Sequence, residues 1–236
     1  LYSVKAQQIE RYNSFGYNVN EGLLQPTMGD MAFDKNNFCW ISFPNGIQKF
    51  DGKNFTNVPV QPGLPDDKLT FLSTCHAGDL FVSHSKGISK YEIAGNRFTQ
   101  VYTAAPGESW AAQFIGDDEG ILYFITQSGS IKGINCQTNK LVSDINSGLI
   151  DHSYNSDYRV KVSSNIIQHR FAFELRSSVY LWDLKKEKLI SRSPVIDSIS
   201  RYILVMKSEN EVLYARYDIS NALLGYNFNE KIHRKI

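Results

Sequence analysis

The sequence predicts an all-β fold, a β-propeller of four-stranded antiparallel blades with about five blades visible. The first observation is an aromatic position that recurs at steps of 41, 42, 48 and 43 residues. An aliphatic position and the end of its strand both recur at 41, 43, 48 and 43. The second observation is that each period reads as four short strands, and a unit of about 40–45 residues with four strands is typical of a propeller blade. The aromatic positions are Trp40, Phe81, Tyr123, Phe171 and Tyr214. The aliphatic positions are Ile47, Ile88, Ile131, Val179 and Ala222, and the strand-end positions are Phe50, Tyr91, Ile134, Trp182 and Gly225.

The strands of the first repeat follow from their residue types. We expect strands over 29–33, 38–43, 47–50 and 55–58, because these short runs are rich in aromatic and β-branched residues. The segments between them carry Asn, Asp, Gly and Pro, which favour turns. We expect one propeller domain or propeller fragment over 1–236. Its repeats are placed at 22–62, 63–106, 107–147, 148–194 and 195–236.

Blades are expected to stack around an axis, because one four-stranded sheet cannot bury both of its faces alone. The recurring aromatic position would then fill the space between neighbouring blades. Residues 2–7 alternate between apolar and polar, so residues 1–21 are expected to supply a strand that completes the last blade.

Two readings of the ring stay open. It is either a small closed ring of five blades, or an incomplete or truncated ring that begins a longer array. We favour the second, because residues 232–236 contain no terminating feature. An incomplete ring would expose an apolar blade face, through which a homodimer is expected.

Composition excludes several classes of protein. The chain has 236 residues, is 42% hydrophobic and 13% aromatic, and therefore can bury a sizeable core, unlike a disordered chain. Its 25 basic and 24 acidic groups leave no basic excess, so no nucleic-acid contact is expected. No apolar run approaches the ~18 residues of a membrane span, so any membrane attachment is expected through regions outside this segment.

The three cysteines, Cys39, Cys75 and Cys136, are 36 and 61 residues apart and match no zinc or redox motif. Three buried thiols are the simplest interpretation. One disulfide with one free thiol is the alternative if the protein is exported.

Three patterns suggest chemistry, and each has a simpler explanation. His84 and His152 each precede a serine, but adjacent residues of a strand point to opposite faces and no nucleophile elbow accompanies them. The acidic run at 117–119 offers oxygens for calcium, but it occupies the slot of an ordinary hairpin turn. Glu174 is an acid in a fold that can host glycosidases, yet glycoside hydrolysis needs a pair of carboxylates. We therefore expect no catalytic residue, no metal and no cofactor.

A ligand is expected on the face of the ring where the links between blades converge. The turn after the aromatic strand should lie on the same face. The candidate ligand residues are Asn45, Lys86, Trp110 and Ser128. Trp110 departs from the repeat pattern, and two roles are open for it: an aromatic surface for a sugar ring, or a cap on the core.

A set of short motifs gives the repeat a closer resemblance. The blades open on Gly22-Leu23, Gly63-Leu64-Pro65 and Gly148-Leu149. In the first repeat Trp40-Ile41-Ser42, Asn45-Gly46-Ile47 and Phe50-Asp51-Gly52 follow in order. This order resembles the two-component regulator propeller repeat, strongly over 20–100, fairly to 150 and loosely beyond.

The resemblance implies an extracytoplasmic, periplasmic location and a sensor function. Members of this family, mostly from Bacteroidetes, form the input regions of hybrid two-component systems and are thought to detect polysaccharide fragments. The expected function is therefore a non-enzymatic sensor propeller that binds an oligo- or polysaccharide and signals to a histidine kinase outside this chain. The alternatives are a stand-alone protein-interaction propeller, suggested by Trp182-Asp183, and a propeller glycoside hydrolase.

Overall fold

The structure, a computed structural model, describes residues 16–64, 69–106, 113–126, 130–146, 161–163, 165–175, 178–194, 202–216 and 223–235. Within these ranges the chain forms five four-stranded sheets, which we call blades 1 to 5. Two short 3-10 helices are also present, η1 (Val19–Glu21) and η2 (Ile93–Gly95). No helix in the described ranges is long and apolar enough to cross a membrane.

Each blade uses four consecutive strands. Blade 1 contains β1 (Asp30–Phe33), β2 (Cys39–Phe43), β3 (Gly46–Phe50) and β4 (Phe55–Val58). Blade 2 contains β5 (Leu69–Thr74), β6 (Leu80–His84), β7 (Gly87–Glu92) and β8 (Arg97–Thr103). Blade 3 contains β9 (Gln113–Asp118), β10 (Ile121–Ile125), β11 (Ser130–Asn135) and β12 (Leu141–Asn146). Blade 4 contains β13 (Lys161–Val162), β14 (Arg170–Leu175), β15 (Ser178–Asp183) and β16 (Lys188–Arg192). Blade 5 contains β17 (Tyr202–Ser208), β18 (Glu211–Arg216), β19 (Leu223–Asn227) and β20 (Ile232–Lys235).

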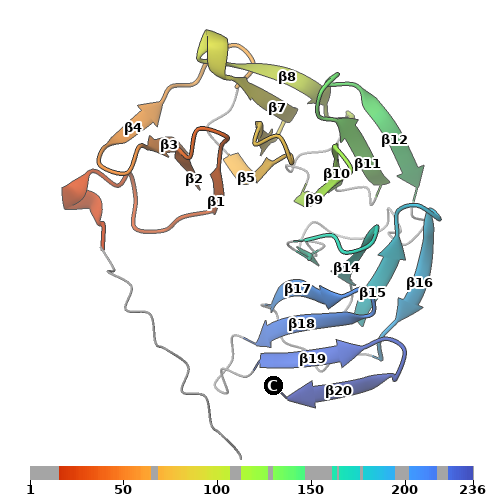
Figure 1. Cartoon of the computed structure of the whole chain (residues 1–236). Coiled ribbons are helices and arrows are strands. Elements are labelled where there is room, and N and C mark those ends of the chain that lie inside the picture. The colour runs from red at the N-terminus through yellow and green to blue at the C-terminus, as the bar shows by residue number, and fades with distance from the viewer. Residues whose placement is uncertain are drawn as a thin grey trace, which may run out of the picture.

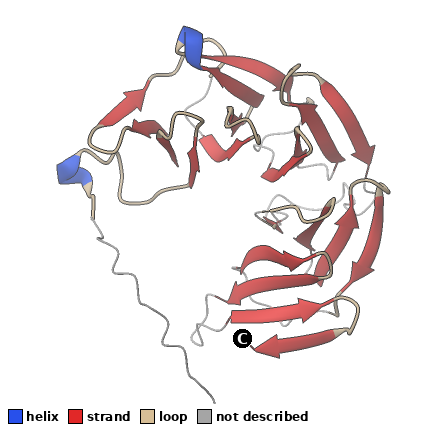
Figure 2. Ribbon diagram, viewed as in Figure 1, coloured by secondary structure: helices blue, strands red, loops and turns tan. Residues whose placement is uncertain are grey.

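The predicted all-β architecture is confirmed. Neighbouring strands within each sheet are antiparallel and follow sequence order. Figure 1 shows the blades following one another along an arc, with β1, β5, β9 and β17 on its inner side and β4, β8, β12 and β16 on its outer side. Figure 2 shows how little of the described chain is helical. The arc is open between blade 1 and blade 5.

Antiparallel order gives the molecule two different faces. The turns between the second and third strands share one face with the links between blades, and we call this the link face. The turns between the first and second strands and between the third and fourth strands lie on the opposite face, which we call the turn face. Glycine is required where these segments pack tightly: a side chain on Gly63 would lie 2.0 Å from the carbonyl oxygen of Phe98.

Apolar side chains fill the seams between blades. Trp40 and Ile47 of blade 1 pack against Leu72, Val82 and Tyr91 of blade 2. Comparable clusters fill the remaining seams between consecutive blades. All five predicted aromatic positions are buried, at 9% exposure or less.

These aromatics fill the seams between blades as expected, but they do not all point toward the same neighbouring blade. Trp40, Phe81 and Tyr123 face the following blade, but Phe171 packs back onto blade 3 and Tyr214 back onto blade 4. In blade 4 the residue that faces forward is Ala172. Successive side chains of a strand alternate between faces, so a one-residue offset in the alignment reverses the assignment.

The expected N-terminal strand at 2–7 lies outside the described residues, whereas residues 19–21 of the same segment form η1. Blade 5 already has four strands from its own repeat. Blade 1 has an apolar face on the side away from blade 2. The segment that follows η1 partly covers this face, where Leu23 and Leu24 pack against it. On the inner strand of that face, Met31 and Phe33 remain 53% and 57% exposed.

Charged groups cross the seams on the turn face. Asp79 of blade 2 pairs with Lys35 of blade 1 at 2.9 Å and with Lys90 at 2.7 Å. The Lys90 ammonium also donates to the Cys136 carbonyl of blade 3 at 2.8 Å. Burial alone would raise the pKa of Asp79, but the hydrogen bonds and charges of the two lysines outweigh it and hold that pKa below its ordinary value.

We expect Asp79→Asn to lower the free energy of unfolding at pH 7 by about 1–2 kcal/mol, because it leaves Lys90 without its anionic partner. A lowered carboxyl pKa stabilises the fold above the ordinary pKa, and this contribution disappears as the pH falls through the lowered value. Urea unfolding of both proteins at pH 7 and near pH 3 measures this difference, which should shrink in acid. Glu187→Gln, at an exposed position of the turn between β15 and β16, removes the same charge from the surface as the control and should have little effect. A difference that is equally large at both pH values would refute an ionic role for Asp79.

Candidate functional site

A cleft of about 610 Å³ lies along the inner strands of blades 1 to 4. Its walls are β1, β5, β9 and the residues at and after β13. The cleft therefore follows the inner side of the arc, which faces the propeller axis (Figure 1). Its volume is within the range of about 300–1,000 Å³ that is usual for ligand sites. We call it the axial cleft.

The walls offer backbone hydrogen-bonding groups. Each inner strand stands at the edge of its sheet and pairs with only one neighbour. Along an edge strand, alternate N–H and C=O groups point away from the sheet. Ligand hydroxyls, which both donate and accept, match such a surface.

Asp30 is the carboxylate of the blade 1 wall. It accepts a hydrogen bond from the backbone N–H of Leu72 at 2.9 Å and another from Met31 at 2.8 Å. The first of these bonds ties β1 to β5 across the seam. Burial raises the pKa of Asp30, and the two backbone hydrogen bonds only partly offset this effect.

Asn165 plays a similar part at the other end of the cleft. Its side chain accepts from the N–H of Met206 at 2.8 Å and donates to the carbonyl of the same residue at 2.9 Å. Blade 4 is thereby joined to the inner strand of blade 5. Side-chain amides and carboxylates therefore fix the relative positions of the inner strands on which the cleft depends.

Apolar and hydroxyl side chains complete the lining. Phe71 of β5 and Phe114 of β9 belong to the lining, and Ser73 and Thr74 supply hydroxyls. Ser163 is fully buried, and its hydroxyl is already used, because it donates to the Asn165 carbonyl and accepts the Ala172 N–H. A few polar groups placed among apolar side chains are characteristic of small-molecule sites. This mixture suits a ligand that has both apolar faces and many hydroxyls.

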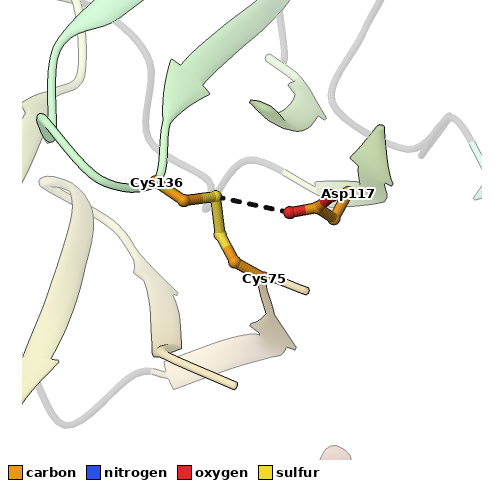
Figure 3. A group of neighbouring side chains, drawn as sticks. All are labelled: Cys75, Asp117 and Cys136. Atoms are coloured by element: carbon orange, nitrogen blue, oxygen red, sulfur yellow. Dashed lines mark hydrogen bonds between the residues drawn. A yellow bond between two sulfur atoms is a disulfide. The ribbon is translucent and has the colours of Figure 1, made fainter. Parts of the chain in front are cut away.

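The turn-face rim of the cleft carries a disulfide between Cys75 and Cys136 (Figure 3). Cys75 follows β5 and Cys136 follows β11, so the bond joins blade 2 to blade 3, with Cα atoms 6.3 Å apart. Asp117 lies beside it, with a carboxylate oxygen 3.5 Å from the Cys136 sulfur. The same oxygen accepts the backbone N–H of His76 at 3.0 Å. The simplest interpretation of the sequence, three buried thiols, is therefore wrong. The alternative is observed: one disulfide, with Cys39 as a free and buried thiol.

The same cluster contains the atoms of a metal site in outline. One ligand atom each from Cys75, Asp117 and Cys136 lies within 4.8 Å of the others. Two thiolates and a carboxylate would suit Zn²⁺. The two sulfurs are bonded to each other here, so these residues fit a disulfide rather than a metal centre, because thiolate ligands require the reduced form.

Two of the four ligand residues predicted from the sequence, Asn45 and Lys86, can be placed, and both lie away from the cleft walls. Asn45 and Lys86 are exposed in corresponding link-face turns, between β2 and β3 and between β6 and β7. Neither is among the residues that line the cleft. Trp110 and Ser128 lie outside the described residues.

Of the two histidines that precede a serine, His152 lies outside the described residues, and His84 has a structural role. His84 is fully buried, and its Nε2 lies 2.8 Å from Ser89 Oγ, which donates to the Gly63 carbonyl. The Lys86 N–H donates to His84 Nδ1 at 3.3 Å. These partners require the neutral Nε2–H form, in which His84 links a hairpin to the blade 1–2 connection.

Two acids of the 117–119 run, for which a hairpin turn was expected, and Glu174 also have defined places. Asp117 accepts the Gly120 N–H at 3.1 Å, as a hairpin turn requires, and Asp118 lies 2.7 Å from His169 Nδ1 across the blade 3–4 seam. Glu174 lies on β14, the second strand of blade 4, and is not a lining residue of the axial cleft.

Sequence reasoning missed Asp30, Ser73, Asn165 and Asp117 as lining residues. The available signal was their polarity at inner-strand positions of a fold whose blade faces are otherwise apolar. That signal indicates an unusual position but does not show that four blades bring such positions together.

No protein-family model matches the sequence, and no curated protein matches it. Solved structures do. The chain matches the extracellular domain of the hybrid two-component system BT3049 from B. thetaiotaomicron with a TM-score of 0.65 and 13% identity, over 93% of this chain and 31% of the other. It matches the extracellular domain of BT4673, described as a one-component system from the same organism, with a TM-score of 0.67 and 13% identity, over 96% and 33%. A chain of the mitotic checkpoint complex gives a TM-score of 0.63 and 11% identity, over 99% and 72%. The chain thus spans about one third of the two bacterial chains, and at these identities the likeness shows the fold alone.

Proposed function

We propose that this chain is a ligand-sensing propeller from the periplasmic input region of a hybrid two-component system, and that it binds an oligosaccharide in the axial cleft. The observation that carries the proposal is the cleft itself. Edge-strand backbone groups, hydroxyls and two phenylalanines line it together. The proposed role is binding without catalysis, and the kinase that responds belongs to another region of the protein.

Two further observations support the proposal. The bacterial structures with this fold are extracellular domains of signalling systems. The Cys75–Cys136 disulfide suits an oxidising compartment, because such bonds seldom persist in the cytosol. The exposed Met31 and Phe33 fit the predicted homodimer through a blade face, which remains a prediction.

A glycan array tests the proposal. We expect the oxidised protein to bind one class of oligosaccharide, and Ser73→Trp to reduce that binding by at least about tenfold, because the indole would occupy cleft volume. Thr56→Trp, at an exposed position of the outer strand β4, is the matched control and should bind as the parent does. Circular dichroism verifies that both variants fold. Failure to bind any glycan, with capture of a protein partner instead, would favour the interaction-propeller alternative.

A further inference from the structure

The charge of the axial cleft points to a class of ligand. Asp30 and Asp117 are the only ionisable side chains among its described lining residues, and none of those residues is Lys, Arg or His. Recognition of carboxylated or sulfated ligands normally relies on Arg or Lys, which supply charge-assisted hydrogen bonds. The lining offers two negative charges and no positive one.

Local contacts orient these two carboxylates. Asp30 accepts the N–H groups of Leu72 and Met31, and Asp117 accepts those of His76 and Gly120. Backbone amides satisfy oxygen lone pairs, but they carry no net charge. An anionic ligand in the cleft would therefore face two like charges at low solvent exposure, where electrostatic repulsion is stronger than in water.

The environment of Asp30 also disfavours an anionic ligand. Burial raises the pKa of Asp30 despite its two backbone hydrogen bonds, so a single negative charge is already disfavoured there. A second anion brought alongside would increase that cost. A neutral sugar has no such cost, and its hydroxyls can donate to the carboxylates.

We propose that the axial cleft selects neutral oligosaccharides and rejects polyanionic ones such as uronates and sulfated glycans. This inference rests on the proposed function and adds the substrate class to it. Asp30 is the specificity-determining residue at the blade 1 wall.

Isothermal titration with paired probes tests the inference. Cellotetraose, mannotetraose and arabinotetraose are each titrated against the oxidised protein, together with their sulfated derivatives and, for the hexose probes, their C6-oxidised uronates. EDTA is present so that no divalent cation bridges the carboxylates to the ligand. We expect a neutral probe to bind and its anionic partners to bind at least about tenfold more weakly at low ionic strength.

Asp30→Asn separates charge from bulk. If electrostatic repulsion excludes the anions, the ratio of the dissociation constants of the anionic and neutral probes should fall several-fold in this variant. The same ratio should fall for the parent protein when salt is added. Asp144→Asn, on the outer strand β12, removes the same charge away from the cleft and should leave the difference unchanged. Tighter binding of an anionic probe, or a difference that Asp30→Asn does not alter, would overturn the inference while leaving the sensor proposal intact. If none of the probes binds, both the inference and the sensor proposal are overturned.

Discussion

Replacing Trp40 by alanine is expected to lower the free energy of unfolding by about 4–5 kcal/mol, because a large side chain leaves a close-packed seam. Trp40 is 1% exposed between blades 1 and 2. Its ring lies 4.6 Å from that of Tyr91 and 6.0 Å from that of Phe98, between centroids. Its Nε1–H donates to the buried carboxylate of Asp34 at 2.8 Å. The substitution therefore creates a cavity and leaves a polar group without this donor.

Two further variants keep this prediction testable if the alanine variant does not fold. Trp40→Phe retains much of the apolar contact and loses the donor, so about 1–3 kcal/mol should be lost. Phe33→Ala, at a half-exposed position on the neighbouring strand β1, should cost less than about 1 kcal/mol. Urea unfolding followed by circular dichroism measures all three. A larger loss for Phe33→Ala than for Trp40→Phe would mean that the assignment of the blade 1 faces is wrong.

Removing the disulfide is the other change with a large expected effect. The bond joins residues 61 positions apart. Closing a loop of that length restricts the unfolded chain by about 4 kcal/mol at room temperature. We expect the Cys75→Ser/Cys136→Ser double variant to lose stability of this order, a fall of roughly 8–15 °C in Tm for a chain of this size. Blades 2 and 3 would then be held together by apolar packing, by the hydrogen bond from Lys90 to the Cys136 carbonyl and by that from the His76 N–H to Asp117.

The redox state of the chain supplies the control. Dithiothreitol should destabilise the parent as the double substitution does and should leave the double variant unchanged. Burial raises the pKa of Cys39, so its thiol should resist alkylation until the protein unfolds. Mass spectrometry after iodoacetamide should find one labelled thiol in the unfolded oxidised chain and three after reduction. Three labelled thiols without reductant would contradict the disulfide.

Periodicity in the sequence was sufficient to predict the blades. The strand expected at 55–58 is β4, and the other three strands expected in the first repeat differ from the observed ones by one residue at their starts. Periodicity carries no information about which face of a blade a residue occupies, because a shift of one residue reverses that face. Phe171 and Tyr214 keep the spacing of the aromatic series, yet they lie on the opposite face of their blades. Alternation along a strand converts a one-residue offset into a reversal, which average spacing cannot detect.

The candidate site was less predictable because it is assembled from several repeats. Asp30, Asp117 and Asn165 come from three different blades, and each resembles an ordinary turn or strand-edge polar residue when read locally. The repeat motif instead drew attention to the link-face turns, where Asn45 and Lys86 are exposed. Only the curvature of the arc brings the inner-strand positions around one cavity.

The central claim is that ligand binds along the inner strands, and hydrogen–deuterium exchange with the tightest-binding glycan of the array tests it most directly. The account predicts slower exchange at amides of residues 30–32, 71–74 and 113–117, which line the axial cleft, with no change in β4, β8 and β12 on the outer side of the arc. Protection confined to the link-face turns around Asn45 and Lys86, with the inner strands unaffected, would contradict it.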